Sequence, residues 1–410
     1  MRLFILFLAI IFSSNLLANQ VGPSIKLAPV EVKEFYKSRD NKTVWTNGKN
    51  ITEIGAYAES ALINADEEGL NPADYHDGVQ ALRDLRKGRI LPDTAEVIFA
   101  KSFFKYVNDV YNGRFDPNIT TMEIWIKQPS VKPGHLIKAG IMEGGTAWID
   151  RLPPNHPQYA KLKKSLINYP QNDDMRAKII TSMESWRWMP RFPGTRYLLV
   201  NIPFYELLGY ENRNEVMQSF IIVGNSENKT PVFSADIFEI IFNPEWHVPE
   251  NIAKKELLPE GRAYLESEGF RKTKYGLVQK SGPDNALGRL RFSMHEKGKT
   301  CNKYQVYIHD TNDKELFYDE ALHIGHGCIR VQKIVTLAKF VFNESSKWSK
   351  EQVKKIMEDG TTQSVKLKDK IPVYMVYFTA WANDDGTADF AEDIYGHHKS
   401  IKNILRIRSE

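Results

Sequence analysis

A histidine and a cysteine near the ends of two apolar segments are spaced as a nucleophile and its base would be. His309 lies in YQVYIHDT (Tyr304–Thr311), and Cys328 lies nineteen positions later in HIGHGCIRV (His323–Val331). A thiol at its reference pKa of about 8.5 is little ionised at neutral pH, so a cysteine nucleophile needs a base within hydrogen-bonding reach. The pair predicts covalent acyl transfer, with Cys328 as the nucleophile and His309 as the base.

Strand alternation is expected to place two more polar groups beside this pair. If Tyr304–His309 forms a strand, Tyr307 and His309 share one face, and Cys328 and Arg330 share a face in the same way. Tyr307 could donate its hydroxyl to an oxyanion or pack against the sheet. Arg330 could bind a substrate carboxylate or hold its own loop through carbonyl groups. The sequence leaves both alternatives open.

The glycine before the cysteine supplies the third part of an acyl-transfer site. Gly327 leaves the backbone free to turn, so that the amides of His326, Gly327 and Cys328 could converge on a developing oxyanion. His326 could also act as an acid or base, but a role through its backbone amide or in substrate binding is the preferred interpretation. A nucleophile, a base and an oxyanion site are therefore all expected here.

HGC followed by IRV, with a histidine upstream, resembles the signature of the L,D-transpeptidases that cross-link bacterial peptidoglycan. The likeness extends over VNIPFYELL (Val200–Leu208), FNPEWHVPENIAKKELLP (Phe242–Pro259), GPDNALGRLRF (Gly282–Phe292) and IPVYMVYFTAWANDDG (Ile371–Gly386). A weaker likeness to the helical scaffold domain of the large Gram-negative members covers FYKSRDNKTVWTNG (Phe35–Gly48), EEGLNPADY (Glu67–Tyr75) and SMESWRWMP (Ser182–Pro190). Most of the chain is thereby covered.

This resemblance implies a reaction and further site residues. Cys328 would attack the carbonyl between the third stem residue, a diamino acid, and the terminal D-alanine, and carbapenems would acylate the same thiol. The thioester would pass to the side-chain amine of a neighbouring stem as a 3→3 cross-link, or to water in an L,D-carboxypeptidase. Asp310 would present its carbonyl to His309, and Asn285 would contact substrate. A retired wall-binding scaffold is the third alternative, although the Cys328 and His309 pair is intact.

Two features depart from the family pattern. Gly325 stands where the family has serine or threonine before HGC, which removes a hydroxyl that could orient its neighbours. Larger relatives insert a peptidoglycan-binding domain after the scaffold, whereas this chain has the short segment Leu152–Asp174. The insert is therefore expected to be missing.

Composition is that of a globular protein with room for two domains. The chain has 410 residues, of which 42% are hydrophobic and 26% charged, and this balance excludes disordered and membrane-embedded classes. A formal charge of +4 gives no reason to expect nucleic acid as a partner. The two cysteines, Cys301 and Cys328, have no metal-ligand spacing, so neither a metal nor a cofactor is predicted. Cys301 is expected to be incidental, since a bridge between them would block the nucleophile.

The first residues are typical of an export signal. Arg2 precedes the apolar run Leu3–Phe12, and Ala18 suits cleavage. A membrane anchor is the alternative, but the run is shorter than the roughly 20 apolar residues that span a bilayer. We expect a periplasmic enzyme whose partners are peptidoglycan tetrapeptide stems, with no stable membrane span after cleavage.

Apolar periodicity changes from helical to strand-like along the chain. Helices are predicted over Ile51–Ala65, Val97–Tyr111, Tyr159–Ile167, Met175–Trp188, Lys333–Phe342 and Glu351–Glu358, and strands over Tyr197–Asn201, Ser219–Gly224, Tyr304–His309 and Pro372–Phe378. The fold class is therefore α+β, with an N-terminal helical scaffold domain and a mainly β catalytic domain with packed helices. The predicted ranges are 1–18 for the signal peptide, 19–172 for the scaffold, 173–400 for the catalytic domain and 401–410 for a tail. Trp186, Trp188 and Trp246 could be sugar-stacking platforms or core residues.

Overall fold

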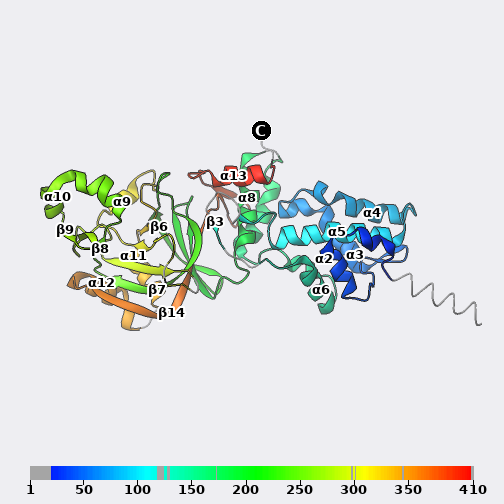
Figure 1. The fold of residues 1–410 in the computed structure, drawn as a ribbon, viewed down its shortest axis with the longest axis horizontal. Helices are drawn as coiled ribbons and strands as arrows, with labels where there is room; N and C mark the ends of the chain where they lie inside the picture. The colour runs from blue at the N-terminus through cyan, green and yellow to red at the C-terminus, as the bar shows by residue number, and fades with distance from the viewer. Residues whose placement is uncertain are drawn as a thin grey trace, which may run out of the picture.

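The structure is a computed structural model of the chain. It describes residues 20–117, 124–126, 130–171, 173–296, 299–300, 302–343 and 346–407. The predicted signal peptide and Cys301 lie outside the described residues, as does Asn172 at the predicted domain boundary. The molecule is elongated, with helices at one end and a sheet at the other (Figure 1).

The N-terminal end is a bundle of amphipathic helices. It contains α2 (Val30–Lys37), α3 (Glu53–Ile63), α4 (His76–Arg86), α5 (Pro92–Tyr111) and α6 (Pro133–Glu143), with the short hairpin β1 (Thr46–Asn47) and β2 (Asn50–Ile51). Trp45 packs against Phe99 and Phe103 of α5 in its core. The fully buried carboxylate of Glu96 accepts bonds from the amides of residues 44–46 and thereby ties the hairpin to α5. Apolar helix faces and one satisfied buried carboxylate thus hold this unit together.

A layer formed from the middle and the C-terminal part of the chain joins the two ends of the molecule. This layer contains α7 (Pro157–Ser165), α8 (Asp174–Trp188), α13 (His397–Ile404) and the hairpin β15 (Ala380–Ala382) and β16 (Ala388–Phe390) (Figure 1). Trp186 and Trp188 are core residues here, 2% and 4% exposed, so they are not open sugar platforms. Tyr159 of α7, which precedes the predicted boundary, is part of the same hydrophobic core as the sheet. The predicted domain boundary near residue 172 stays a prediction.

The catalytic end is a sheet that closes on itself. Its strands, in spatial order, are β11 (Leu290–His295), β12 (Ile308–His309), β13 (Ile329–Val331), β6 (Asn214–Ile222), β5 (Glu206–Glu211), β4 (Arg196–Asn201), β14 (Gln363–Val376), β7 (Val232–Phe242) and β3 (Ile124–Trp125). Because β11 also pairs with β7, all but β3 form a ring. The helices α11 (Ile334–Val341) and α12 (Lys350–Asp359) pack on it. The predicted α+β fold class is confirmed.

The predicted strand Tyr304–His309 is much shorter in the structure. Strand pairing is confined to Ile308–His309, because Asn302 accepts a bond from the amide of Val306 and Gln305 adopts a positive φ of 56°. A turn therefore replaces the first half of the predicted strand. The predicted strand Pro372–Phe378 is instead the end of the long β14.

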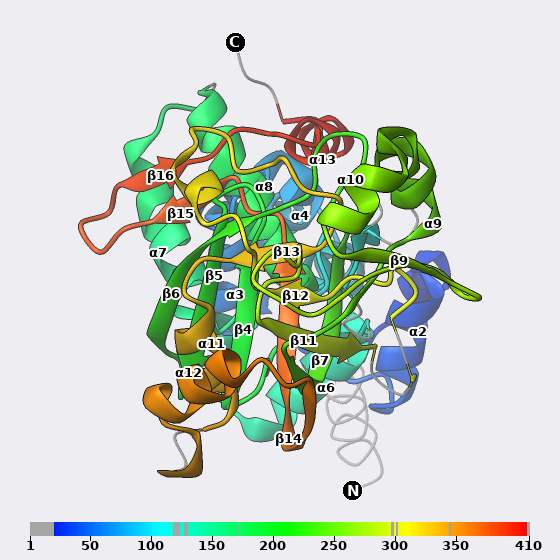
Figure 2. The ribbon, with the colours of Figure 1, turned by 90° about the vertical axis from the view of Figure 1, so that its left-hand side faces the viewer.

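A small second sheet stands beside β12 and β13. It consists of β8 (Trp246–His247), β10 (Gly276–Gln279) and β9 (Phe270–Thr273), with α9 (Glu250–Ile252), the π-helical turn η7 (Ala253–Leu257) and α10 (Gly261–Ser267). It has an apolar cluster of its own, which includes Val248, Leu265 and Leu277. We call this segment, residues 246–279, the cap; Figure 2 shows it beside the site strands.

Candidate active site

Two short parallel strands bring four predicted site residues together. Strands β12 and β13 pair in the register Ile308 with Ile329 and His309 with Arg330, and the amide of Ile329 donates to the carbonyl of Tyr307 at 3.1 Å. This register sets Tyr307 opposite Cys328, two residues before His309 opposite Arg330. Because side chains alternate along paired strands, all four lie on one face.

The thiol of Cys328 is free and half-buried, and its hydrogen-bond donors come from Tyr307. Burial raises the thiol pKa to about 11, against the lowering effect of the Tyr307 amide and hydroxyl. Tyr307 itself has a pKa raised by burial, so its hydroxyl stays protonated and can donate. At neutral pH Cys328 is therefore a protonated thiol, which would have to lose its proton to act as a nucleophile.

His309 is neutral and correctly polarised to remove that proton. Its Nδ1 lies 2.5 Å from the carbonyl oxygen of Asp310. A carbonyl only accepts hydrogen bonds, so Nδ1 carries the proton and Nε2 keeps its lone pair. Burial, helped by the charge of Arg330, lowers the imidazole pKa to about 3. The ring is a neutral base over the physiological pH range.

The turn before Cys328 is held by buried hydroxyl groups that sequence reasoning missed. Gly327 has a φ of 96°, a conformation that favours glycine. The hydroxyl of Thr230 donates to the Gly327 carbonyl at 2.9 Å. The oxygen of that hydroxyl also accepts a bond from the amide of Gly224 at 2.9 Å. Tyr395 accepts from the Thr230 amide at 3.2 Å and donates to the Gly224 carbonyl. These contacts fix the segment whose amides are the predicted oxyanion donors.

The departure at Gly325 has a steric reason in this fold. Gly325 forms a bridge with Gly224, and its amide donates to the carbonyl of Val223 at 2.8 Å. A Cβ on Gly325 would lie 2.9 Å from that carbonyl oxygen. The backbone approach that replaces the family's serine or threonine leaves no space for a side chain.

Asp310 and Asn285 stabilise a turn behind the base. Asp310 is 3% exposed; its carboxylate accepts from the Arg289 amide at 2.8 Å and pairs with Lys314. Asn285 is 1% exposed, and its side chain forms hydrogen bonds within its own turn, donating to the Lys280 carbonyl at 2.9 Å. This placement favours a structural role for Asn285 over the predicted contact with substrate.

His326 faces the cap instead of the strands. Its Nε2 lies 2.8 Å from a carboxylate oxygen of Glu256 in η7. Trp246, where the cap begins, bonds to the Tyr307 side chain. The cap thus touches both the HGC turn and the residue that holds the thiol.

Arg291 is a third residue, after Thr230 and Tyr395, that sequence reasoning missed. It lies opposite His309 on β11, with its guanidinium carbon 5.2 Å from the centre of the Tyr307 ring. Its charge lowers the pKa of Cys328. The alternating pattern of LRF in GRLRF was the available signal, since it places Arg291 away from the core-facing Leu290 and Phe292. A cation therefore stands beside the tyrosine and the thiol.

The described residues contain no group of three or more His, Cys, Asp or Glu side chains that could hold a metal ion. Over the same residues, none of the helices has the length and apolarity to cross a membrane.

Comparisons with known proteins agree on one family. A scaffold-domain family model matches residues 30–166, and the L,D-transpeptidase catalytic-domain model matches residues 195–362. A Haemophilus influenzae protein assigned as an L,D-transpeptidase is 26% identical over 255 residues, which are 56% of this chain and 50% of that protein. The chain thus matches about half the length of this curated relative.

Solved structures with similarity include L,D-transpeptidases of Enterococcus faecium and Mycobacterium tuberculosis. The first, a mutant form, shares 11% identity over 45% of this chain and 50% of the other, with a TM-score of 0.23. The second shares 12% identity over 44% and 61%, with a TM-score of 0.19. Scores this low add nothing to the assignment, which rests on the two family models and the curated relative. The chain belongs to the L,D-transpeptidase family, with a scaffold domain ahead of the catalytic domain.

Proposed function

We propose that this protein is a periplasmic transpeptidase that forms 3→3 cross-links in peptidoglycan through a thioester on Cys328. The observation that carries the proposal is the thiol bonded by Tyr307, on the same strand-pair face as a neutral His309 whose Nε2 is unprotonated. This combination suits a nucleophile that is deprotonated as it attacks.

In the first half-reaction, the Cys328 sulfur attacks the carbonyl that joins the diamino acid to the terminal D-alanine. The thiol proton passes to His309 Nε2, and the negative charge on the carbonyl oxygen is stabilised by the amides around Gly327 and the Tyr307 hydroxyl. Collapse of this intermediate breaks the peptide bond, and His309 returns the proton to the departing D-alanine amine. A thioester on Cys328 remains.

In the second half-reaction, the side-chain amine of another stem attacks the thioester. His309 accepts a proton from this amine, a new amide bond forms, and Cys328 leaves as a thiol after reprotonation. We expect an amine rather than water as acceptor, on the hypothesis that the cap, which contacts the HGC turn through Glu256 and His326, limits the access of water to the thioester.

The decisive experiment incubates purified protein with a disaccharide tetrapeptide and resolves the products by mass. The proposal expects dimers joined through two diamino acids, with release of D-alanine. Exclusive conversion to tripeptide at high acceptor concentration would replace it with an L,D-carboxypeptidase. Cys328→Ala should give neither product nor a carbapenem adduct, whereas Cys301→Ser should be nearly silent.

A further inference from the structure

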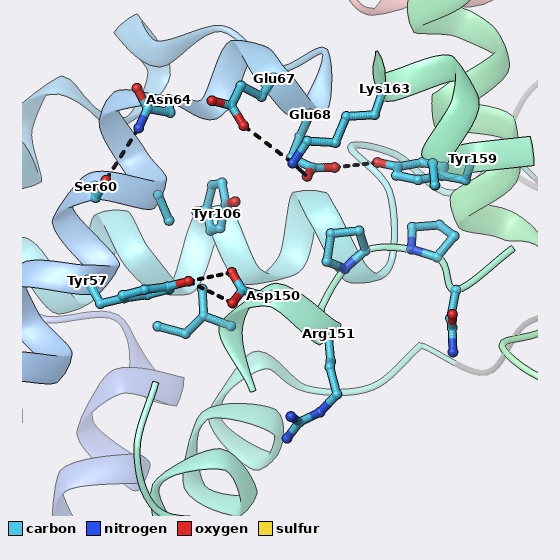
Figure 3. A pocket seen from close by; sticks show the side chains of 16 residues that line it. Tyr57, Ser60, Asn64, Glu67, Glu68, Tyr106, Asp150, Arg151, Tyr159 and Lys163 are labelled. Carbon is cyan, nitrogen blue, oxygen red and sulfur yellow. Dashed lines mark hydrogen bonds and ion pairs between the residues drawn. The ribbon is translucent and has the colours of Figure 1, made fainter. Parts of the chain in front are cut away.

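A cavity far from Cys328 opens between the helical unit and α7. Its volume is about 730 Å³, within the roughly 300–1,000 Å³ that small-ligand sites occupy. Figure 3 shows Tyr57 of α3 and Asp150 of η5 (Ile149–Arg151) on one side and Glu68, Tyr159 and Lys163 on the other.

Two of the carboxylates in this cavity are hydrogen-bonded within its walls. Tyr57 donates its hydroxyl to both carboxylate oxygens of Asp150, at 2.8 and 2.6 Å. Glu68 accepts from the Tyr159 hydroxyl at 2.7 Å and from Lys163 Nζ at 2.6 Å. Glu67 shares Lys163 with Glu68, at 3.4 Å, so carboxylate acceptors outnumber the cations in these walls. The cavity therefore suits a ligand that presents hydroxyl and amide hydrogens and carries no negative charge. Each carboxylate oxygen can still accept a further bond.

Tyr57 provides a fixed flat surface for such a ligand. Its side chain is 38% exposed, although its hydroxyl is tied to another element, so the ring is held in place while its surface stays open. Proline rings at 153 and 154 add apolar lining. The C–H bonds on one face of a sugar ring pack on flat apolar surfaces of this kind, while its hydroxyls need the surrounding acceptors.

A second, much smaller cavity of about 50 Å³ shares part of its wall with the first. Pro154 and Asn155 line both, and the second also contains Phe192, which is 74% exposed. This space is too small for a sugar ring, so contact with a second unit of a repeating ligand rests on the exposed ring of Phe192.

These cavities lie at the opposite end of strand β6 from the thiol. Arg213, which lines the second cavity, immediately precedes β6, whereas Gly224 just beyond β6 contacts the HGC turn. Nine strand residues span about 30 Å. One stem peptide cannot fill both places, but a polymer that carries such peptides can.

We propose that this cavity binds the glycan strand of peptidoglycan, a neutral chain of N-acetylated sugars, and holds the polymer while Cys328 acts on an attached stem. The choice of this glycan among saccharides rests on the proposed function. The peptidoglycan-binding insert of larger relatives is predicted to be missing here. The cavity would provide a wall-binding site in its place.

The test uses chitohexaose, a neutral chain of N-acetylated sugars without stem peptides, and titrates it into the full chain by calorimetry. Tyr57→Ala should weaken binding at least tenfold, and Phe192→Ala, which changes an exposed side chain, should weaken it severalfold. Tyr275→Ala is the matched control, because this tyrosine is 82% exposed between β9 and β10, away from the cavity. Turnover of a soluble disaccharide tetrapeptide should stay at the wild-type rate in Tyr57→Ala and Phe192→Ala.

Absence of glycan binding by the wild type, or equal affinity of the wild type and the Tyr57 and Phe192 variants, would overturn the site. So would an equal loss in Tyr275→Ala, or weakened binding of sugar-free stem peptide in Tyr57→Ala. Failure of the proposed function has a different signature, since the wild type would then not turn over the tetrapeptide even if it bound glycan.

Discussion

At the scale of single residues, the base and the oxyanion donors are separable. His309 presents a free Nε2 because Nδ1 is committed to the Asp310 carbonyl, whereas His326 is bonded to Glu256 in the cap. Tyr307 contacts the thiol through both its amide and its hydroxyl. The three side chains are therefore expected to contribute differently to the rate of acylation.

We predict a graded loss of acylation rate. His309→Ala should slow carbapenem acylation about 10⁴-fold by removing the base, and Tyr307→Phe about 10²-fold by removing one donor. His326→Ala should slow it less than tenfold, since only its contact with the cap is lost. Single-turnover mass spectrometry gives the three rates. A larger loss for His326→Ala than for His309→Ala would exchange their roles.

The pKa of Cys328 makes a second prediction. Because burial raises it to about 11, the thiolate fraction should grow about tenfold per pH unit between pH 7 and 10. The rate of iodoacetamide labelling of Cys328, followed in a Cys301→Ser background, should rise accordingly. A plateau near neutral pH would instead reveal a thiolate–imidazolium pair, for which His309 would need a pKa well above 3.

At the scale of elements, the HGC turn depends on close backbone contact between the β6 end and β13. Gly224 and Gly325 form a bridge there, and Thr230 bonds to the Gly327 carbonyl. No side chain separates the two segments, so small residues set the position of the oxyanion amides.

Restoring the family's serine is therefore expected to be harmful. Gly325→Ser should destabilise the protein by about 1–3 kcal/mol, because its Cβ would meet the Val223 carbonyl at 2.9 Å. Denaturant unfolding measures the loss, and acylation should slow in parallel. Gly282→Ser, at a turn where an added Cβ has open space, is the matched control and should be neutral. A stability gain in Gly325→Ser would show that the turn relaxes readily.

At the scale of the whole molecule, a buried arginine joins the two ends. Arg187 of α8 is 1% exposed; it bonds to Glu184 at 2.8 Å, to the Tyr159 hydroxyl at 2.9 Å and to the Glu68 carbonyl in the helical unit. Glu184 also accepts the amide of Arg114 at 2.6 Å. One network thus spans the scaffold and the layer under the sheet.

Arg187→Met should cost about 3–5 kcal/mol, because it leaves the carboxylate of Glu184 buried without its cation. We expect the loss in thermal unfolding, with the scaffold separating from the rest before the sheet unfolds. Lys178→Met, on the same helix, removes only the hydrogen bond from this partly buried lysine to the Ala391 carbonyl. It should lower the stability much less. Equal effects of the two changes would contradict the role of the network.

The sequence by itself determined the fold class and singled out the candidate catalytic residues. Cys328, His309 and Gly327 could be proposed because a candidate nucleophile, base and turn are close along the chain and each residue type has few alternatives in that pattern. The alternation that places Tyr307 with His309 was correct in effect, although only Ile308–His309 pairs as strand. The helical scaffold followed from local periodicity, which is a property of neighbouring residues.

Tertiary structure alone decided which distant residues complete the site. Thr230, Arg291 and Tyr395 lie 98, 37 and 67 positions from Cys328, and pattern reasoning cannot bring together residues that only a closed sheet makes adjacent. Asn285 lies in a segment that resembles the family, yet its side chain is hydrogen-bonded within its own turn. Burial, which raises the pKa of Cys328 and lowers that of His309, likewise arises only when the sheet closes and removes water from both groups.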